Sequence, residues 1–136
     1  MSAPGWSTKD PDFLCPCIRN RYDRFMSLIG LWVTVLETAR DMKRQEYYKS
    51  IGASRTLRSK HLIAPKVMDD KGALAFDVAP TEYLYMKAWN PNGPLWKAMG
   101  KIGKSVGLQW GGELWAPGFI DKPHFQLERC QCDAKS

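Results

Sequence analysis

The sequence predicts an α+β domain, with one long helix, one shorter helix and a small, mostly antiparallel sheet. Apolar residues recur at three- and four-residue steps over 22–49 and again over 95–106, as expected for helices. Short runs with strand character lie between and after these stretches, at 73–78 (ALAFDV), 108–110 (LQW) and 124–128 (HFQLE). We expect one domain over 1–136, because a chain of 136 residues has ordinary domain size.

The first half of the chain begins with residues 1–20, which are rich in Pro, Gly and Ser and predict an irregular N-terminal arm. The long helix over 22–49 presents one apolar stripe, made of Phe25, Leu28, Ile29, Trp32, Val33, Leu36 and Ala39. Gly52 is a plausible stop for it. The polar and basic stretch 53–60 predicts a loop leading into an edge strand.

The second half alternates turn signals with short elements. The sequence DDKG at 69–72 predicts a turn, and the strand that follows over 73–78 is ended by Pro80. A second turn is predicted at 90–94, NPNGP. The shorter helix after it is expected to be loosened by its glycines, Gly100, Gly103 and Gly107.

Composition narrows the class of protein. A hydrophobic fraction of 44% and six tryptophans favour a folded core over disorder. The net charge of +6 makes a polyanionic partner plausible: nucleic acid, an anionic membrane face or anionic cell-wall polymer. No signal peptide is visible, and the most apolar stretch, 25–36, is shorter than the roughly 20 residues that span a bilayer. We therefore expect a soluble protein made in the cytoplasm, without stable membrane insertion.

Four cysteines form two C-x-C pairs, Cys15 with Cys17 and Cys130 with Cys132. They are interpreted either as reduced thiols of a cytosolic protein or as disulfides that staple the two ends of the domain together. A zinc knot is the third alternative, although structural zinc sites more commonly use C-x-x-C.

The chain has two histidines, and a catalytic zinc site of two imidazoles and one carboxylate would need both. Asp77 suits the third position, because it stands inside an apolar strand where a lone carboxylate is costly to bury. Asp121, three residues before His124, is a candidate general base, and Glu113 is its rival. The alternative for His61 and His124 is an ordinary packed or surface role.

Four segments in order, SKHL, ALAFDVAP, GLQWGGELW and DKPHFQLE, resemble the motif series of the zinc peptidases that cut bacterial cell-wall peptides. This family comprises D-Ala-D-Ala carboxypeptidases and phage L-alanyl-D-glutamate endopeptidases. The similarity covers about 31–127, and ETARDMKRQEYYKSIGASRT resembles the family's segment before the first histidine. The resemblance implies a hedgehog/D-Ala-D-Ala-peptidase-like fold.

The same resemblance implies a role for individual residues. The expected zinc ligands are His61, Asp77 and His124, with Asp121 as the catalytic acid and base. Arg40 matches the arginine at the end of the family's helix and is expected to bind substrate or steady the oxyanion. The residues expected to contact substrate are Ser59, Trp110 and Trp115, although core packing is the commoner role of a tryptophan.

The chain departs from the family pattern between the first two ligands. Residues 62–72 read as an insertion, and Ala73 occupies the place of a family glycine. If the insertion disturbs the strand, Asp69 or Asp70 replaces Asp77 as ligand; otherwise both belong to a solvated turn. A second cation bound there is a further possibility.

The implied function is zinc-dependent hydrolysis of peptidoglycan stem peptides, by a monomeric phage endolysin that cuts the L-alanyl-D-glutamate bond in host lysis. It would be made in the host cytoplasm and act on the cell wall. The alternatives are a D-Ala-D-Ala carboxypeptidase and a wall-binding module without activity. A nucleic-acid-binding domain using Arg55, Arg58 and Lys60 is a rival of another class, but no nucleic-acid motif supports it and we expect no such partner.

Overall fold

The structure of the chain is a computed structural model, which describes residues 3–54, 59–63, 72–85, 90–113 and 120–132. Its centre is a four-stranded antiparallel sheet in the order β2-β4-β6-β5. The strands are β2 (Val33–Glu37), β4 (Ala75–Pro80), β5 (Gln109–Trp110) and β6 (His124–Gln126). A second, two-stranded sheet pairs β1 (Ser7–Thr8) with β3 (Ala39–Arg40). The predicted α+β class is confirmed.

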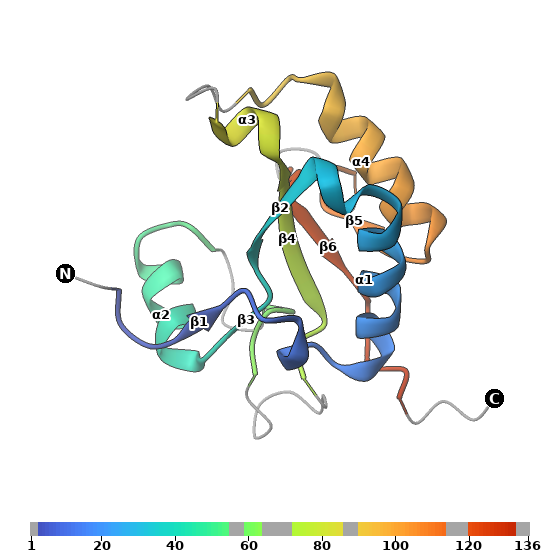
Figure 1. Cartoon of the computed structure of the whole chain (residues 1–136). Helices are drawn as coiled ribbons and strands as arrows, with labels where there is room; N and C mark the ends of the chain where they lie inside the picture. The colour runs from blue at the N-terminus through green and yellow to red at the C-terminus, as the bar shows by residue number, and fades with distance from the viewer. Residues whose placement is uncertain (1–2, 55–58, 64–71, 86–89, 114–119, 133–136) are drawn as a thin grey trace.

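The helices are α1 (Pro16–Ile29), α2 (Met42–Ser50), α3 (Thr81–Tyr85) and α4 (Pro94–Ser105), with 3-10 turns η1 (Pro11–Phe13) and η2 (Gly30–Trp32). Helices α1 and α4 contact each other and cover the same side of the central sheet (Figure 1). Helix α2 lies beside β1 and β3, apart from that layer (Figure 1). No helix among the described residues is long and apolar enough to cross a membrane.

The predicted long helix over 22–49 is wrong, because this stretch contains parts of two helices with strands between them. The helical spacing holds through Ile29, and the chain then turns through η2 at Gly30. Val33, Thr34 and Val35 follow, and such β-branched residues lose side-chain freedom in a helix and fit a strand well. The apolar residues of this strand happen to follow those of the helix at helical spacing, so the sequence pattern looked like one continuous helix.

The irregular arm over 1–20 is also shorter than predicted. Pro16 occupies the first turn of α1, where its missing N–H costs nothing, and Ile18 is fully buried. Residues before it form β1 and η1. The N-terminal segment is therefore part of the fold.

Several predicted elements of the second half are confirmed. Helix α4, strands β5 and β6 and the turn at 90–94 lie within a residue or two of their predicted positions, whereas β4 runs over Ala75–Pro80 and not over 73–78. Gly52, expected to follow the helix before it, has a φ of 79° in the left-handed region. The aspartates at 69 and 70 lie outside the described residues.

The core fills the space between α1, α4 and one face of the sheet. Phe76 of β4 and Phe125 of β6 are cross-strand partners, and both rings contact Phe25 of α1. Successive side chains of a strand point to opposite faces. The next pair in register, Asp77 and His124, therefore projects to the face away from the helices.

The glycines of α4 allow close packing, whereas the sequence suggested that they loosen the helix. A Cβ on Gly103 would lie 2.1 Å from Cε1 of Phe125, and one on Gly100 would lie 2.4 Å from the ring of Trp110. Both distances are far below van der Waals contact, so only glycine lets α4 approach these rings. The approach fixes β5 and β6, and hence the position of His124.

Candidate metal centre and active site

Three predicted zinc ligands lie together on the face of the sheet away from α1 and α4. Asp77 and His124 face each other across β4 and β6, and His61 lies in a turn beside β3. One donor atom from each of the three lies within 4.8 Å of the others. Two sheet strands and one hydrogen-bonded turn thus bring together residues that are 16 and 47 positions apart.

The ring of His61 is held in one orientation by the backbone. Its Nδ1 lies 3.0 Å from the carbonyl oxygen of Thr38, and because a carbonyl only accepts, the proton is assigned to Nδ1. Its Nε2 then directs a lone pair toward Oδ1 of Asp77, 3.0 Å away. Two acceptors at this distance require a positive charge between them, either a proton or a metal ion.

His124 shows the same arrangement with its ring nitrogens exchanged. Its Nε2 lies 2.8 Å from Oε1 of Gln126, which assigns the proton to Nε2. Its Nδ1 lies 3.1 Å from the same Oδ1 atom of Asp77. Metal-binding histidines typically donate the second ring N–H to an oxygen in this way.

The charges at the centre favour a cation. Burial alone would raise the pKa of Asp77, but the charge of His61 and the hydrogen bonds with His124 and His61 outweigh it and hold this pKa well below its usual range. Burial lowers the pKa of His124, yet the hydrogen bond and charge of Asp77 raise it overall. An ionised carboxylate between two oriented imidazoles matches the ligand set of a catalytic zinc ion, so these residues fit the metal.

Asp121, the predicted general base, lies in the turn that leads into β6. Its backbone N–H donates to the carbonyl of Gly111, and its own carbonyl accepts from the N–H of His124. Burial and then the negative charge of Asp77 raise the pKa of Asp121 above its usual value. A cavity of about 420 Å³ opens beside it, lined by Pro91, Trp96, Ile120, Asp121, Lys122 and Pro123.

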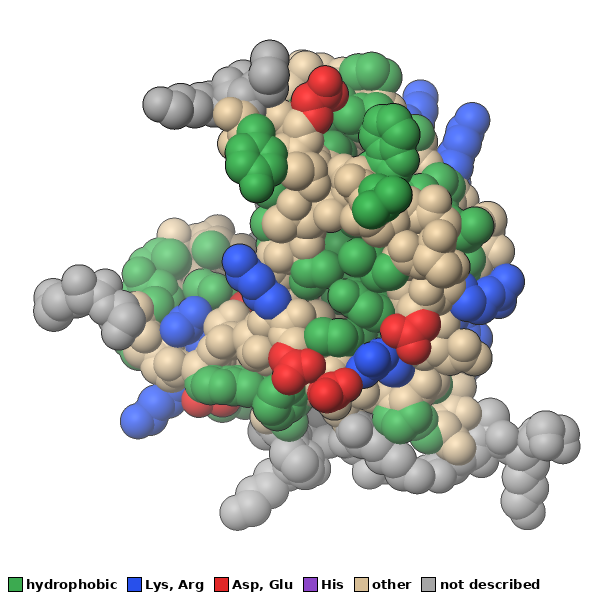
Figure 2. All heavy atoms as spheres, viewed as in Figure 1, with side chains coloured by type: hydrophobic (Ala, Val, Ile, Leu, Met, Phe, Trp, Pro, Cys, Tyr) green, Lys and Arg blue, Asp and Glu red, His purple; other side chains and the backbone are tan. Residues whose placement is uncertain are grey.

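The space-filling view shows a hollow through which a substrate would reach the central sheet (Figure 2). The surface is hollowed between the parts of the molecule that carry α3 and α2 (Figure 2). Neither histidine is visible on the face shown, in keeping with exposed fractions of 1% for His61 and 5% for His124 (Figure 2). The imidazoles are buried, while the Asp77 side chain keeps 21% of its surface exposed.

Glu113, the rival base, is placed differently. Its side chain is 52% exposed and forms an ion pair with Lys104 at the end of α4. A carboxylate paired on the surface lacks the burial that raises the pKa of Asp121. The structure therefore favours Asp121 over Glu113.

Arg40 lies on β3 rather than at the end of a helix. Its backbone N–H donates to the carbonyl of His61, and its guanidinium forms a 2.8 Å ion pair with Glu37 and stacks 4.6 Å from the ring centre of Tyr48. The Nε atom of Arg40 is buried without a hydrogen-bond partner among the described residues. A buried donor without a partner is rare in folded proteins and suggests a missing acceptor.

Glu37 was not singled out in the sequence. Its carboxylate binds Arg40, Ser7 and Tyr48, and it lies 4.0 Å from Nδ1 of His61. An acidic residue in the apolar run VTVLE was the available signal, by the same reasoning that selected Asp77. Gln126, two residues after His124 on the same face of its strand, could have been found from strand alternation.

The predicted substrate contacts have different positions. Ser59 accepts a hydrogen bond from the N–H of His61 and so shapes the turn that carries this ligand. Trp110 is 6% exposed, belongs to the core and donates from Nε1 to the carbonyl of Lys122, next to Asp121. Trp115 lies outside the described residues.

Comparison with known proteins gives a consistent match. The family described as D-alanyl-D-alanine carboxypeptidase matches residues 52–127, which include the three candidate ligands and Asp121. The L-alanyl-D-glutamate peptidase of Listeria phage A118 is 34% identical over 98 residues, covering 72% of this chain and 31% of the phage protein. This chain thus spans about a third of that relative's length.

A solved structure shows the same fold. The L-Ala D-Glu endopeptidase ChiX of Serratia marcescens matches with a TM-score of 0.63, over 86% of this chain and 82% of that chain. The sequences are 23% identical over this match.

Proposed function

Since the chain belongs to the D-alanyl-D-alanine carboxypeptidase family of peptidases, we propose that it is a zinc peptidase that hydrolyses the stem peptides of bacterial peptidoglycan. The observation that carries this proposal is the convergence of His61, Asp77 and His124 next to Asp121 and its cavity. Three donors, two from the sheet and one from a turn, would leave room for a fourth ligand, as in catalytic zinc sites.

A zinc ion bound there would polarise the scissile carbonyl and lower the pKa of a bound water. Asp121 would accept the proton of the attacking water and pass it to the departing amine. Its raised pKa suits this exchange, because an acid–base group works best when its pKa approaches the working pH. The backbone hydrogen bonds of Asp121 with Gly111 and His124 would hold it in place for both steps.

Arg40 would bind the substrate's negative charge, either a carboxylate or the oxyanion that forms during attack. Its guanidinium is oriented by Glu37 and Tyr48, so it loses little freedom when a substrate binds. The Nε has no partner within the part of the chain that the structure describes, and a substrate oxygen would supply an acceptor for it. Ser59 and Trp110 would act by positioning His61 and the loop of Asp121.

We propose the L-alanyl-D-glutamate bond as the one cleaved, in agreement with the name of the Listeria phage relative. We also propose a role as a phage endolysin in host lysis, which the phage origin of that relative supports. The net charge of +6 would help the protein to dock on an anionic wall.

Mass spectrometry of muropeptides after digestion of purified peptidoglycan tests this function. We expect new N-terminal D-glutamate, and we expect the products to disappear with a chelator and with Asp121→Asn. Glu113→Gln is the matched control, because it neutralises a nearby carboxylate that is paired with Lys104 on the surface. Loss of terminal D-alanine would indicate a carboxypeptidase instead, and unchanged muropeptides with zinc-loaded protein would contradict the enzyme proposal.

A further inference from the structure

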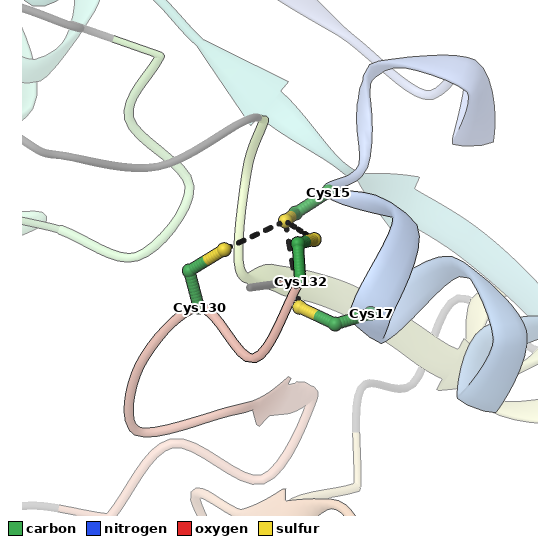
Figure 3. Close-up of side chains that lie close together, drawn as sticks. All are labelled: Cys15, Cys17, Cys130 and Cys132. Carbon is green, nitrogen blue, oxygen red and sulfur yellow. Dashed lines mark hydrogen bonds between the residues drawn. The ribbon is translucent and has the colours of Figure 1, made fainter. Parts of the chain in front are cut away.

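A second cluster of metal-binding side chains lies outside the candidate active site. It contains the four cysteines, and one sulfur from each lies within 4.8 Å of the others. Cys15 and Cys17 come from the start of α1, whereas Cys130 and Cys132 come from the segment after β6 (Figure 3). The side chains from these two segments converge on one point (Figure 3).

The sulfur positions are not those of disulfides. The Sγ of Cys15 lies 3.1 Å from that of Cys132 and 3.4 Å from those of Cys17 and Cys130. A disulfide bond measures about 2.05 Å and joins only two sulfurs. A disulfide would bring the sulfur of Cys15 close to one other sulfur, whereas here it has three near neighbours. All four cysteines are free thiols in the structure.

A tetrahedral zinc ion accounts for this geometry. Zinc–sulfur bonds of about 2.3 Å place the four sulfurs of a Cys₄ site about 3.8 Å apart, so small side-chain shifts from the present positions would accommodate the ion. Cys15 is buried and the other three are partly buried, as expected of a closed site without a water ligand.

Burial raises the pKa of the Cys15 thiol, so a cation is needed to hold it as a thiolate, and three groups around the sulfurs suit that charge. The backbone N–H of Gln131 donates to Sγ of Cys17 over 3.4 Å, an interaction that stabilises negative charge on sulfur. Cys15 and Cys17 lie at the N-terminus of the 14-residue helix α1, where the helix dipole favours anions. Arg21 donates to the carbonyl of Cys17 and to the side chain of Gln131, so a fixed cation bridges the two cysteine segments.

We propose that Cys15, Cys17, Cys130 and Cys132 bind one zinc ion in a closed structural site that ties α1 to the segment after β6. Binding converts four thiols to thiolates and releases their four protons to solvent, leaving a complex of net charge −2 beside Arg21. This site is independent of the proposed peptidase function.

The position of the cluster gives the site a structural consequence. The N–H of Cys15 donates to the carbonyl of Ala73, two residues before β4, and the N–H of Leu127 donates to the carbonyl of Leu74. The cluster thus adjoins the strand that carries Asp77 and the strand that carries His124. A zinc ion there would hold the N-terminal part of α1 and the ends of both strands in one arrangement.

Zinc content of the full chain, purified under reducing conditions, tests the site. We expect two equivalents in the wild type and one in the double variant His61→Ala/His124→Ala, which keeps the cysteines. The double variant Cys17→Ser/Cys132→Ser should lose the other equivalent. A histidine variant without zinc, or a wild type whose intact mass shows two disulfides, would overturn the proposal.

Cobalt(II) substitution gives a second measurement that does not depend on the folding of a variant. All four cysteines of the sequence belong to this cluster, so the wild type should show the thiolate-to-cobalt charge-transfer absorption of tetrahedral coordination. Absence of this band in cobalt-loaded wild type would also overturn the proposal. Neither readout measures peptidase activity, so this site and the proposed function can fail separately.

Discussion

The cluster of His61, Asp77 and His124 combines nitrogen and oxygen donors on the sheet face away from α1 and α4, whereas the cysteine cluster combines four sulfurs where α1 meets the segment after β6. The first has three protein donors and a cavity beside its neighbour Asp121. The second has four donors that surround their own centre. Three donors leave a coordination position for water or substrate, and four close it.

This difference suggests a catalytic role for the first cluster and a structural role for the second. The imidazoles of the first cluster contact Asp77, and those of His61 and His124 also contact Thr38 and Gln126 respectively, so we expect removal of one ligand to affect mainly the ion. The second cluster joins segments that are 115 residues apart in sequence, so removing one of its ligands affects the fold. Variants in the two clusters should therefore have opposite effects on activity and stability.

The largest expected effect is on activity and comes from Asp77→Ala. Loss of this ligand should lower peptidoglycan hydrolysis by about 10³-fold or more, because the Lewis acid and the activated water depend on the ion. Zinc content should fall by one equivalent, with the cysteine site still loaded. Retention of full lysis and both zinc equivalents would remove Asp77 from the site.

The next effect is on stability and comes from Cys132→Ser. We expect the free energy of unfolding to fall by about 3–5 kcal/mol, since structural zinc binding contributes directly to folding. Urea unfolding measures this change, and Ser27→Ala serves as a surface control. If Cys132→Ser unfolds at the same urea concentration as the wild type, the cysteine cluster has no structural role.

A smaller effect is expected for Glu37→Gln, which alters the surroundings of the first cluster without removing a ligand. The variant leaves Arg40 buried without its carboxylate partner, and breaking a buried ion pair is destabilising. We expect about 10-fold lower kcat/KM from a misoriented guanidinium, with zinc content unchanged. Restoration of activity by the double variant Glu37→Gln/Arg40→Lys, or a loss of zinc in Glu37→Gln, would contradict the role assigned to Glu37.

The ligands of the first cluster were predicted from the resemblance to the peptidase family, because the local signals alone left an ordinary packed or surface role open for both histidines. Asp77 interrupts an apolar strand, and His124 follows an aspartate and a proline before an alternating stretch. The contacts of Glu37 with Arg40 and Tyr48, by contrast, depend on how the chain turns after Ile29, where the predicted helix was wrong. Periodicity alone could not distinguish a stripe that continues along one helix from a helix followed by a strand.

The arrangement of the cysteines was also beyond the sequence. Two C-x-C pairs were equally compatible with free thiols and with disulfides, because their chemistry depends on the distance between segments 15–17 and 130–132. That distance is set by the packing of α1 on β4 and β6 through Phe25, Phe76 and Phe125. Because this distance depends on packing throughout the core, the residues around each cysteine pair do not reveal it.

The smallest expected effect comes from Asp41, which touches neither cluster. Its carboxylate accepts hydrogen bonds from the N–H groups of Trp6 and Arg44 and caps α2. Burial alone would raise the pKa of Asp41, but these hydrogen bonds outweigh it and lower the pKa below its usual value. The charged form therefore stabilises the fold above the unfolded pKa of about 3.9, and this stabilisation is lost as the pH falls through the folded pKa.

Asp41→Ala should cost about 1 kcal/mol near neutral pH, the usual value of a lost N-cap, with both zinc equivalents and the activity retained. The difference in unfolding free energy between wild type and Asp41→Asn should shrink as the pH falls below about 4, because the carboxyl of the unfolded wild type is protonated first and that of the folded protein at lower pH. Urea unfolding of both proteins across this pH range measures the difference. Any loss of metal at low pH affects both proteins equally and so cancels in the comparison. A zinc equivalent lost on Asp41→Ala would show that stability and metal binding are coupled throughout the domain, and the separation of the two clusters would fail.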